Sequence, residues 1–312
     1  MFKARSIKMS NSAKYSVIGV LLLALFLGTL ITGCSNKTAQ KSSNDDQIQE
    51  QKHLLVYAGS ASKPPTEEAA QLFEQKTGIR VDLVFGGSGT VLSQMKLNKQ
   101  GDLYFPGSSD FMEKAKKENL VYSETEKKIV YLVSAINVQK GNPKGITGLQ
   151  DLLKPGIKVA IANPETVCVG LYATEIIENA LSPAEIQAFK KNLLNYTESC
   201  DKTATAISLK TVDAVIGWSV FEYWDTEKIQ TIPLPKDQIR RIGYIPIAIS
   251  SFTKEKVLAQ NFIDFLESAE GKAIFKKHNY FASPEEAKNY IGVDKPVGGE
   301  YKLPEGWIKS ES

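Results

Sequence analysis

Histidine and cysteine are scarce in this chain, which has only two histidines and three cysteines among 312 residues. His53 lies at the edge of a polar segment and His278 lies among lysines, so a Ser-His or Cys-His catalytic pair has little to work with. The spacings H-x-x-H, H-E-x-x-H and C-x-x-C do not occur, which argues against a zinc site. We therefore expect a protein that is not an enzyme and that needs neither a metal nor another cofactor.

The glycine-rich segment GGSGT, residues 86–90, also lacks residues that two familiar motifs require. It is not the nucleophile elbow G-x-S-x-G, because Thr90 stands where the second glycine belongs. It is not the dinucleotide fingerprint G-x-G-x-x-G either, since Leu92 occupies the third glycine position. These absences exclude the two most obvious catalytic and cofactor-binding interpretations.

Without its amino-terminal segment, the chain also has no excess of positive charge. The formal net charge is +3, but four of the 38 basic residues and none of the 35 acidic residues lie in residues 1–33. The remainder therefore carries 34 basic and 35 acidic side chains, a balance of −1. No arginine-rich or aromatic-basic stripe is present, so we expect no nucleic-acid partner.

The first 33 residues have the order of a secretory signal: a basic start, an apolar run from Tyr15 to Gly33, and small residues before Cys34. The ending LITGC resembles the bacterial lipobox, in which the cysteine is lipidated and becomes the mature amino terminus. An uncleaved membrane anchor is the alternative, because the run is nearly long enough to span a bilayer. Residues 34–52 are polar without an apolar period and predict a flexible tether. Either way, we expect an extracytoplasmic protein anchored at the cell membrane, by a lipid on Cys34 in the first case.

The rest of the chain alternates strands and helices, which indicates an α/β fold with a largely parallel sheet. Strands are predicted at 54–59, 79–87 and 102–107, then at 129–138, 157–163, 213–218, 229–235 and 242–250. Ser182, Pro183 and Glu185 have the spacing of a helix start with a capping box. Two α/β blocks joined by the long strands 129–138 and 242–250 predict a two-lobed, periplasmic-binding-protein-like fold with a ligand cleft between the lobes.

The domain boundaries follow from this pattern. We expect a lipoprotein signal peptide at 1–33 and a tether at 34–52. Lobe one should comprise 53–133 and 246–285, and lobe two 134–245. The Gly/Pro/Lys-rich residues 286–312 predict a loose carboxyl-terminal tail.

Three turns place small or hydroxyl residues between a strand and a helix: YAGSAS at 57–62, FGGSGT at 85–90 and NPETVCVG at 163–170. Such turns offer free backbone N–H groups and hydroxyl donors, and the start of a helix favours negative charge. Gly/Ser turns are common in any βα loop, so each one alone is a weak signal. Three of them in one chain favour a site for an anion.

Cys168 lies in the third of these turns, and Cys200 lies just before the segment DKTATAI, residues 201–207. In an exported chain, two spare cysteines favour a disulfide, here closing a loop of 32 residues. The alternatives are a dithiol site for a soft ligand and two unpaired bystanders.

Residues 54–285 resemble the extracytoplasmic binding proteins of molybdate/tungstate ABC importers, which have the type II solute-binding fold. The segment VYAGSASKPPTEEAAQLFEQKTGIRVDLVFGGSGTVLSQM, residues 56–95, is the most specific part of the similarity. The segments GDLYFPGSSD at 101–110, ANPETVCVGLYATE at 162–175 and GYIPIAI at 243–249 match the family further along the chain. The resemblance implies a molybdate-type or tungstate-type oxyanion as ligand, an ABC permease as membrane partner and a monomeric state.

The same resemblance implies a set of ligand-binding residues. Ser60 and Ser88 would supply hydroxyl and backbone donors, and Val169 and Thr203 would supply backbone N–H groups. A register shift would hand the role of Ser60 to Ala61 or Ser62.

This chain departs from the family pattern at several positions. Gly217 and Trp218 stand where the family often has a tyrosine hydroxyl, and Cys168 stands in place of its usual proline. Val167 occupies the best match to a carboxylate that some members use to expand coordination of the metal. We therefore expect a tetrahedral anion held by hydrogen bonds alone.

Two other functions stay open at this point. The ligand can be a different oxyanion, either sulfate-like or a thiophilic one held by Cys168 and Cys200. The chain can also be a tethered sensory or adhesive module without a permease.

Overall fold

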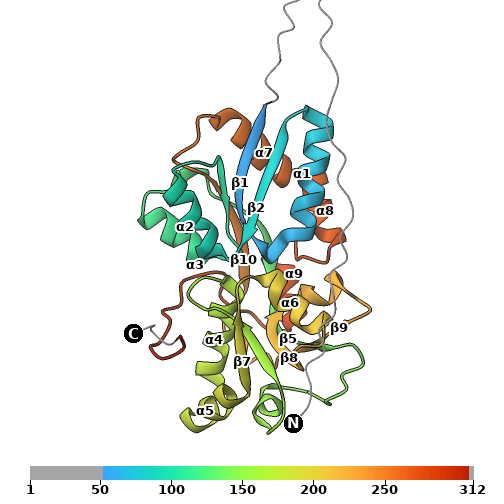
Figure 1. The fold of residues 1–312 in the computed structure, drawn as a ribbon. Coiled ribbons are helices and arrows are strands. Elements are labelled where there is room, and N and C mark those ends of the chain that lie inside the picture. Colours follow the sequence, from blue (N-terminus) through green and yellow to red (C-terminus); the bar gives the residue numbers. More distant parts are fainter. Residues whose placement is uncertain (1–51, 309–312) are drawn as a thin grey trace, which may run out of the picture. The chain divides into compact units, whose positions relative to one another are not determined.

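Two five-stranded sheets, each flanked by helices, make up the described part of the chain. The structure is a computed structural model that describes residues 52–308. The expected signal peptide at 1–33, the lipidation site Cys34 and nearly all of the tether lie outside the described residues. Residues 52–308 belong to one compact unit, in which the two sheets are built from different parts of the chain (Figure 1).

The first sheet has the strand order β2-β1-β3-β10-β4. Its strands are β1 (His53–Gly59), β2 (Arg80–Gly86), β3 (Leu103–Phe105), β4 (Lys127–Leu132) and β10 (Gly243–Ile249). β1 runs parallel to β2 and β3, and β10 runs antiparallel to β3 and β4. This sheet and the helices α1 (Lys63–Thr77), α2 (Ser88–Asn98), α3 (Ser109–Lys117), α7 (Lys256–Glu267) and α8 (Ala269–Lys277) are called lobe one.

The second sheet has the strand order β7-β6-β8-β5-β9. Its strands are β5 (Ser134–Gln139), β6 (Val159–Ala162), β7 (Leu193–Thr197), β8 (Ala214–Trp218) and β9 (Ile229–Pro233). β6 runs parallel to β7 and β8, and β5 runs antiparallel to β8 and β9. This sheet and the helices α4 (Cys168–Ala180), α5 (Pro183–Asn192) and α6 (Cys200–Ser208) are called lobe two.

Local sequence signals account for several helix boundaries. α1 has prolines in its first turn and ends at Gly78, whose φ of 71° is a left-handed conformation that glycine adopts without strain. α5 begins with the expected capping box, in which the backbone N–H of Glu185 donates to Ser182 Oγ and the Glu185 carboxylate accepts from the Ser182 N–H. The two-lobed α/β prediction is confirmed by these two sheets and their helices.

One expectation about an individual element is wrong, and two further elements are not predicted from the sequence. The predicted strand 129–138 is two strands in different sheets, β4 and β5, because the chain passes between the lobes at Val133. Both β7 and α6 were missed, since each is short and their apolar residues form no clear period.

The carboxyl-terminal segment is packed rather than loose. α9 (Pro284–Ile291) follows lobe one, and Ile242 pairs with Val297 in a parallel bridge. Trp307 is 2% exposed; its ring packs near Phe189, and its indole N–H donates to Glu178 at 2.5 Å. An isolated tryptophan in a Gly/Pro-rich stretch gave no periodic signal, so the sequence could not show that this segment has a packing site.

Candidate functional site

The turns after β1, β2 and β3 meet at the carboxyl end of the sheet of lobe one. Ser88, the first residue of α2, accepts a hydrogen bond at Oγ from the Gly107 N–H at 3.0 Å. Its carbonyl accepts a second one from the Tyr104 hydroxyl at 2.9 Å. A Cβ at Gly59 would stand 2.6 Å from Ser88 Oγ and 2.7 Å from Gly107 N, so only glycine lets these turns pack so closely.

Two helix starts of lobe two face these turns. Cys168 begins α4 after β6, and Cys200 begins α6 after the neighbouring strand β7. The backbone N–H of Asp201 donates to Ser60 Oγ at 3.4 Å, and the Gly89 N–H donates to the Thr166 carbonyl at 2.8 Å. The lobes are therefore in contact. We call this contact the seam; it consists of residues 59–61, 87–89 and 106–108 from lobe one and 163–169 and 198–203 from lobe two.

Two thiols occupy the middle of the seam. Cys168 and Cys200 are free and buried, with their sulfurs 3.6 Å apart. The disulfide that the sequence favours is not formed in this structure, although the two residues are neighbours in space. Burial raises the pKa of the Cys200 thiol well above its ordinary value and Cys168 raises it further, while the Val169 N–H, which hydrogen-bonds the sulfur, lowers it. The thiol form is therefore the stable one at neutral pH.

Cys168 also touches lobe one. A Cβ added at Gly107 would lie 2.5 Å from Cys168 Sγ and 2.6 Å from the Cβ of Ala61. The Cys168 sulfur therefore packs against Gly107 of lobe one. The structure thus places the Cys168 sulfur between the lobes, next to both Cys200 and Gly107.

Ser60, Ala61, Ser88 and Val169 lie at the seam as expected, and all four are buried. Ser62 lies outside the seam, and Thr203 makes its hydrogen bonds within lobe two. The Ser62 hydroxyl accepts from Thr66 Oγ1 one turn along α1, at 3.1 Å.

The Thr203 N–H is already part of the first turn of α6, where it donates to the Ser199 carbonyl at 3.0 Å. Its hydroxyl bonds to Thr197 Oγ1 and to the same carbonyl. Because α6 begins at Cys200, the backbone donor facing lobe one is that of Asp201, two residues earlier than the sequence suggested.

Trp218 and Gly217 lie at the end of β8, where the related proteins often have a tyrosine. A Cβ at Gly217 would lie 2.3 Å from the Asn137 side-chain oxygen, so this glycine serves close packing. The Trp218 ring packs edge-on against Tyr172 of α4, with centroids 4.9 Å apart.

Several buried donors in the described residues have no hydrogen-bond partner. Among residues 52–308, the Trp218 indole N–H and the hydroxyls of Tyr172 and Ser108 are buried and make no hydrogen bond. An unpaired buried polar group costs about 1–3 kcal/mol, so each one favours a ligand atom that accepts its hydrogen. Tyr172 stands four residues after Cys168 on α4. Its unpaired hydroxyl is not predictable from the sequence, because the sequence does not show where the side chain lies.

A cavity of about 390 Å³ opens beside the seam, and both lobes line it. Phe85, Gly87 and Thr90 contribute from lobe one, and Thr166, Glu198, Ser199, Asp201 and Lys202 contribute from lobe two. A larger cavity of about 1110 Å³ lies between α3 and the carboxyl-terminal segment. Its lining carries Asp110, Glu165, Glu300 and Glu305 with Lys114 as its one cation, so it is a poor site for an anion.

Neither a membrane span nor a metal cluster is found in the described part of the chain. Within residues 52–308, no helix is both long and apolar enough to cross a bilayer. No group of three or more His, Cys, Asp or Glu side chains in that range is arranged to hold a metal ion.

Comparison with known proteins assigns the family. The model of the bacterial extracellular solute-binding proteins matches residues 54–280, most of the chain. The chain belongs to this family. Its members are transport proteins, so the expectation that the chain is not an enzyme is confirmed.

Individual relatives agree with this assignment. A Haemophilus influenzae protein named as a binding protein is 28% identical over 239 residues, which are 73% of this chain and 90% of the relative. A Bacillus subtilis protein named as an ABC transporter substrate-binding lipoprotein is 23% identical over 86% of this chain and 98% of its own. The periplasmic molybdate-binding protein of Azotobacter vinelandii shares the fold, with a TM-score of 0.64 and 18% identity over 74% of this chain and 99% of that one.

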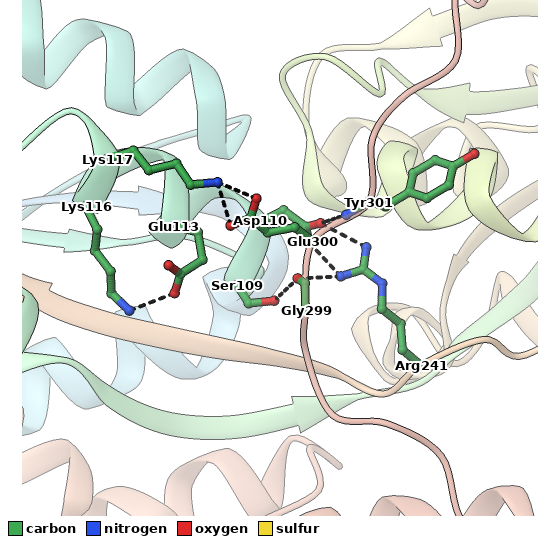
Figure 2. A network of polar contacts seen from close by, with 9 residues as sticks. All are labelled: Ser109, Asp110, Glu113, Lys116, Lys117, Arg241, Gly299, Glu300 and Tyr301. Carbon is green, nitrogen blue, oxygen red and sulfur yellow. Dashed lines mark hydrogen bonds and ion pairs between the residues drawn. The ribbon is translucent and has the colours of Figure 1, made fainter.

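In this solute-binding protein, a buried arginine network joins both lobes to the carboxyl-terminal segment. Figure 2 shows the part of it that Arg241 forms with Asp110 and Gly299. Arg241, just before β10, donates to both Asp110 oxygens at 2.9 and 3.1 Å and to Glu175 at 2.7 Å. It also donates to the Gly299 carbonyl at 2.8 Å, and its guanidinium lies 4.0 Å from the centroid of the Tyr172 ring. Asp110 belongs to α3 of lobe one and Glu175 to α4 of lobe two, so one side chain ties the two lobes together.

Asp201 should make the stability of this solute-binding protein depend on pH. Burial opposes its ionisation, but the hydroxyls of Ser199 and Ser60 and the charge of Lys63 lower its pKa overall. Because the folded pKa is below the unfolded value of about 3.9, the stabilisation is present above that value and is lost as pH falls through the folded pKa. When the pH falls from neutral to about 3, we expect the unfolding free energy of Asp201→Asn, measured by urea denaturation, to decrease less than that of wild type.

The exposed residue Asp237 provides the control for this prediction. Asp237→Asn should keep the wild-type dependence of unfolding free energy on pH. Equal slopes for wild type and Asp201→Asn below pH 4 would show that the Asp201 carboxylate does not stabilise the fold.

Proposed function

We propose that this chain is the substrate-binding component of an ABC importer, anchored outside the cytoplasm by a lipid on Cys34, and that its lobes close on a tetrahedral oxyanion, molybdate or tungstate. The observation that supports the ligand class is the arrangement at the seam. The starts of α2, α4 and α6 converge there from both lobes, and helix starts favour an anion. The molybdate-binding protein from Azotobacter vinelandii has the same fold.

The chemistry of the seam suits an anion that needs donors only. Ser60 and Ser88 carry hydroxyl donors, and the Asp201 N–H points across the seam, where Ser60 Oγ accepts it. In the described residues, no lysine or arginine side chain hydrogen-bonds to Ser60, Ser88, Cys168 or Cys200. The donors of the seam are therefore neutral dipoles, and we call this set of donors the cage. A fully deprotonated dianion accepts from every donor and has no hydrogen of its own to place.

The Asp201 carboxylate is a negative group close to these donors, since the N–H of the same residue bonds to Ser60. Its oxygen accepts from the Ser199 hydroxyl at 2.6 Å, and Lys63 lies close enough to lower its pKa. Its charge is thus bound locally and partly balanced, so it opposes a dianion less than an unpaired carboxylate would.

A ligand screen tests the proposal. Molybdate or tungstate at a hundredfold excess over its Kd should stabilise the folded protein by about 2.7 kcal/mol, which thermal unfolding detects as a rise in Tm. Sulfate should give a smaller rise in Tm. It is smaller than molybdate and tungstate, so a site of the size that fits the two larger anions should discriminate against it. If none of the three anions raises Tm, the proposed ligand class is wrong.

Ser88 should contribute strongly to affinity for the anion. Removing one charge-assisted hydrogen bond costs about 1.5–3 kcal/mol, so Ser88→Ala should weaken molybdate binding roughly ten- to hundredfold in calorimetry. Ser93→Ala is the matched control, since Ser93 is on the exposed side of α2 and bonds only to the Gly89 carbonyl. Equal affinities for the two variants would remove Ser88 from the site.

A further inference from the structure

The two thiols of the seam are not used by an oxyanion held through dipoles. Each cysteine is 1% exposed, and their sulfurs are 3.6 Å apart. They come from two different helix starts on adjacent parallel strands, β6 and β7, and Cys168 also meets Gly107 across the seam. Two thiols in contact at the centre of a ligand site are a chemical group in their own right.

We propose that Cys168 and Cys200 form a dithiol site for a trivalent oxyacid of a thiophilic element, with arsenite as its probe. This inference rests on the proposed function, because it assigns a second ligand class to the seam on which the lobes close. The ligand would be a neutral, undissociated acid rather than a dianion.

The distance between the sulfurs favours a bent bridge. An atom bonded at about 2.3 Å to each sulfur, the length of a zinc–thiolate bond, would subtend an angle of roughly 100° at the observed separation. A linear two-coordinate cation would instead need sulfurs about 4.6 Å apart. The angle is that of a pyramidal or tetrahedral centre.

Binding of arsenite would proceed by condensation without a change of oxidation state. Each sulfur forms a bond to arsenic, and each new bond releases one hydroxide that leaves with the thiol proton as water. Trihydroxyarsenic and two thiols therefore give a dithioarsenite with one remaining hydroxyl and two water molecules. No charge is created in the seam, which suits a place where burial keeps the Cys200 thiol protonated by raising its pKa.

A divalent metal fits this site less well. Zinc and similar ions take four ligands, and within residues 52–308 no third His, Cys, Asp or Glu joins the two thiols in a metal-binding arrangement. A trivalent centre needs only the two sulfurs and its own hydroxyl. The opposite lobe offers the Ser60 hydroxyl next to α6, where the Asp201 N–H reaches it at 3.4 Å.

Arsenite titration of the full chain carrying Cys34→Ser tests the site, since only Cys168 and Cys200 can then react. We expect one arsenic per chain by mass spectrometry, with the mass of two waters lost, and at least a hundredfold weaker binding in Cys168→Ala and in Cys200→Ala. Gly107→Ala keeps both thiols and places a methyl group against Cys168, so it should weaken arsenite binding at least tenfold. Gly148→Ala, where a Cβ meets nothing within 4 Å, should bind as wild type does.

Three results would overturn the proposal. The first is a chain purified without reductant in which Cys168 and Cys200 form a disulfide. The second is the absence of arsenic binding by the reduced chain. The third is an unchanged arsenite affinity in Gly107→Ala, because arsenite bound between the two lobes should be affected by a methyl group added to lobe one. Molybdate titration of the same samples separates the two proposals: arsenite binding without molybdate binding removes the oxyanion proposal and supports the dithiol.

Discussion

Replacing Gly107 by alanine should open the seam and reduce affinity for any ligand enclosed there at least tenfold. The new Cβ would lie 2.5 Å from Cys168 Sγ and 2.6 Å from Ala61 Cβ, distances that real contacts do not allow. Cys168 is fixed at the start of α4 in lobe two, and Ala61 is fixed in lobe one. Separation of the lobes relieves the clash with Cys168, whereas the clash with Ala61 needs a local deformation of lobe one, at a cost of about 1–3 kcal/mol.

Two measurements distinguish these responses. Small-angle scattering with ligand should show that wild type becomes more compact, whereas Gly107→Ala stays expanded. Thermal unfolding without ligand reports any deformation of lobe one separately. Gly148→Ala is the control, because its backbone is extended with φ of −178° and its Cβ would meet nothing. If Gly107→Ala closes and binds ligand as Gly148→Ala does, the seam accommodates the added methyl group and this prediction is wrong.

Local rules predicted the parts of the fold that depend on neighbouring residues. The capping box at Ser182 and the prolines in the first turn of α1 mark where helices begin, and the alternation of strands and helices predicts parallel sheets. The division of 129–138 between two sheets was not predictable in the same way. An apolar run looks the same whether its residues bond to one sheet or to two, so only the packing of both lobes shows that the chain crosses at Val133.

The site shows the same division between local and tertiary information. Strand-to-helix turns with Ser60 and Ser88 could be found from the sequence, because they lie directly after strands. Whether Thr203 or Asp201 presents its N–H to lobe one depends on where α6 begins, and the short helix gave no clear start. The proximity of Cys168 and Cys200 follows from the pairing of β6 with β7, a strand that the sequence did not reveal.

Arg241 is the clearest case of a feature that no local pattern could show. Its partners Asp110 and Glu175 are 131 and 66 residues away in the sequence. Each lies on a different lobe, and each looks like an ordinary helix carboxylate. Only the packing of both lobes and the carboxyl-terminal segment brings the three side chains into one network, of which Figure 2 shows the contacts of Arg241 with Asp110 and Gly299.

Arg241→Met should destabilise the protein by about 3–5 kcal/mol, because it removes one partner of a buried ion-pair network. Arg241 is 6% exposed, and the side chains of Asp110 and Glu175 are 7% and 14% exposed, so both carboxylates would stay buried without a cation. In a chain of this size the loss corresponds to a fall in Tm of roughly 10 °C. The segment around Gly299 would also lose its contact with the guanidinium, so limited proteolysis should cleave it sooner.

Two further variants separate the charge network from the simple loss of a large side chain. Arg240→Met changes the exposed neighbour of Arg241 and should keep the unfolding free energy within about 0.5 kcal/mol of wild type. Adding Asp110→Asn and Glu175→Gln to Arg241→Met removes the two stranded charges, so this triple variant should recover part of the lost stability. A triple variant no more stable than Arg241→Met would place the contribution of Arg241 in its packing on Tyr172 and its bond to Gly299, and would exclude the ion pairs as the main source.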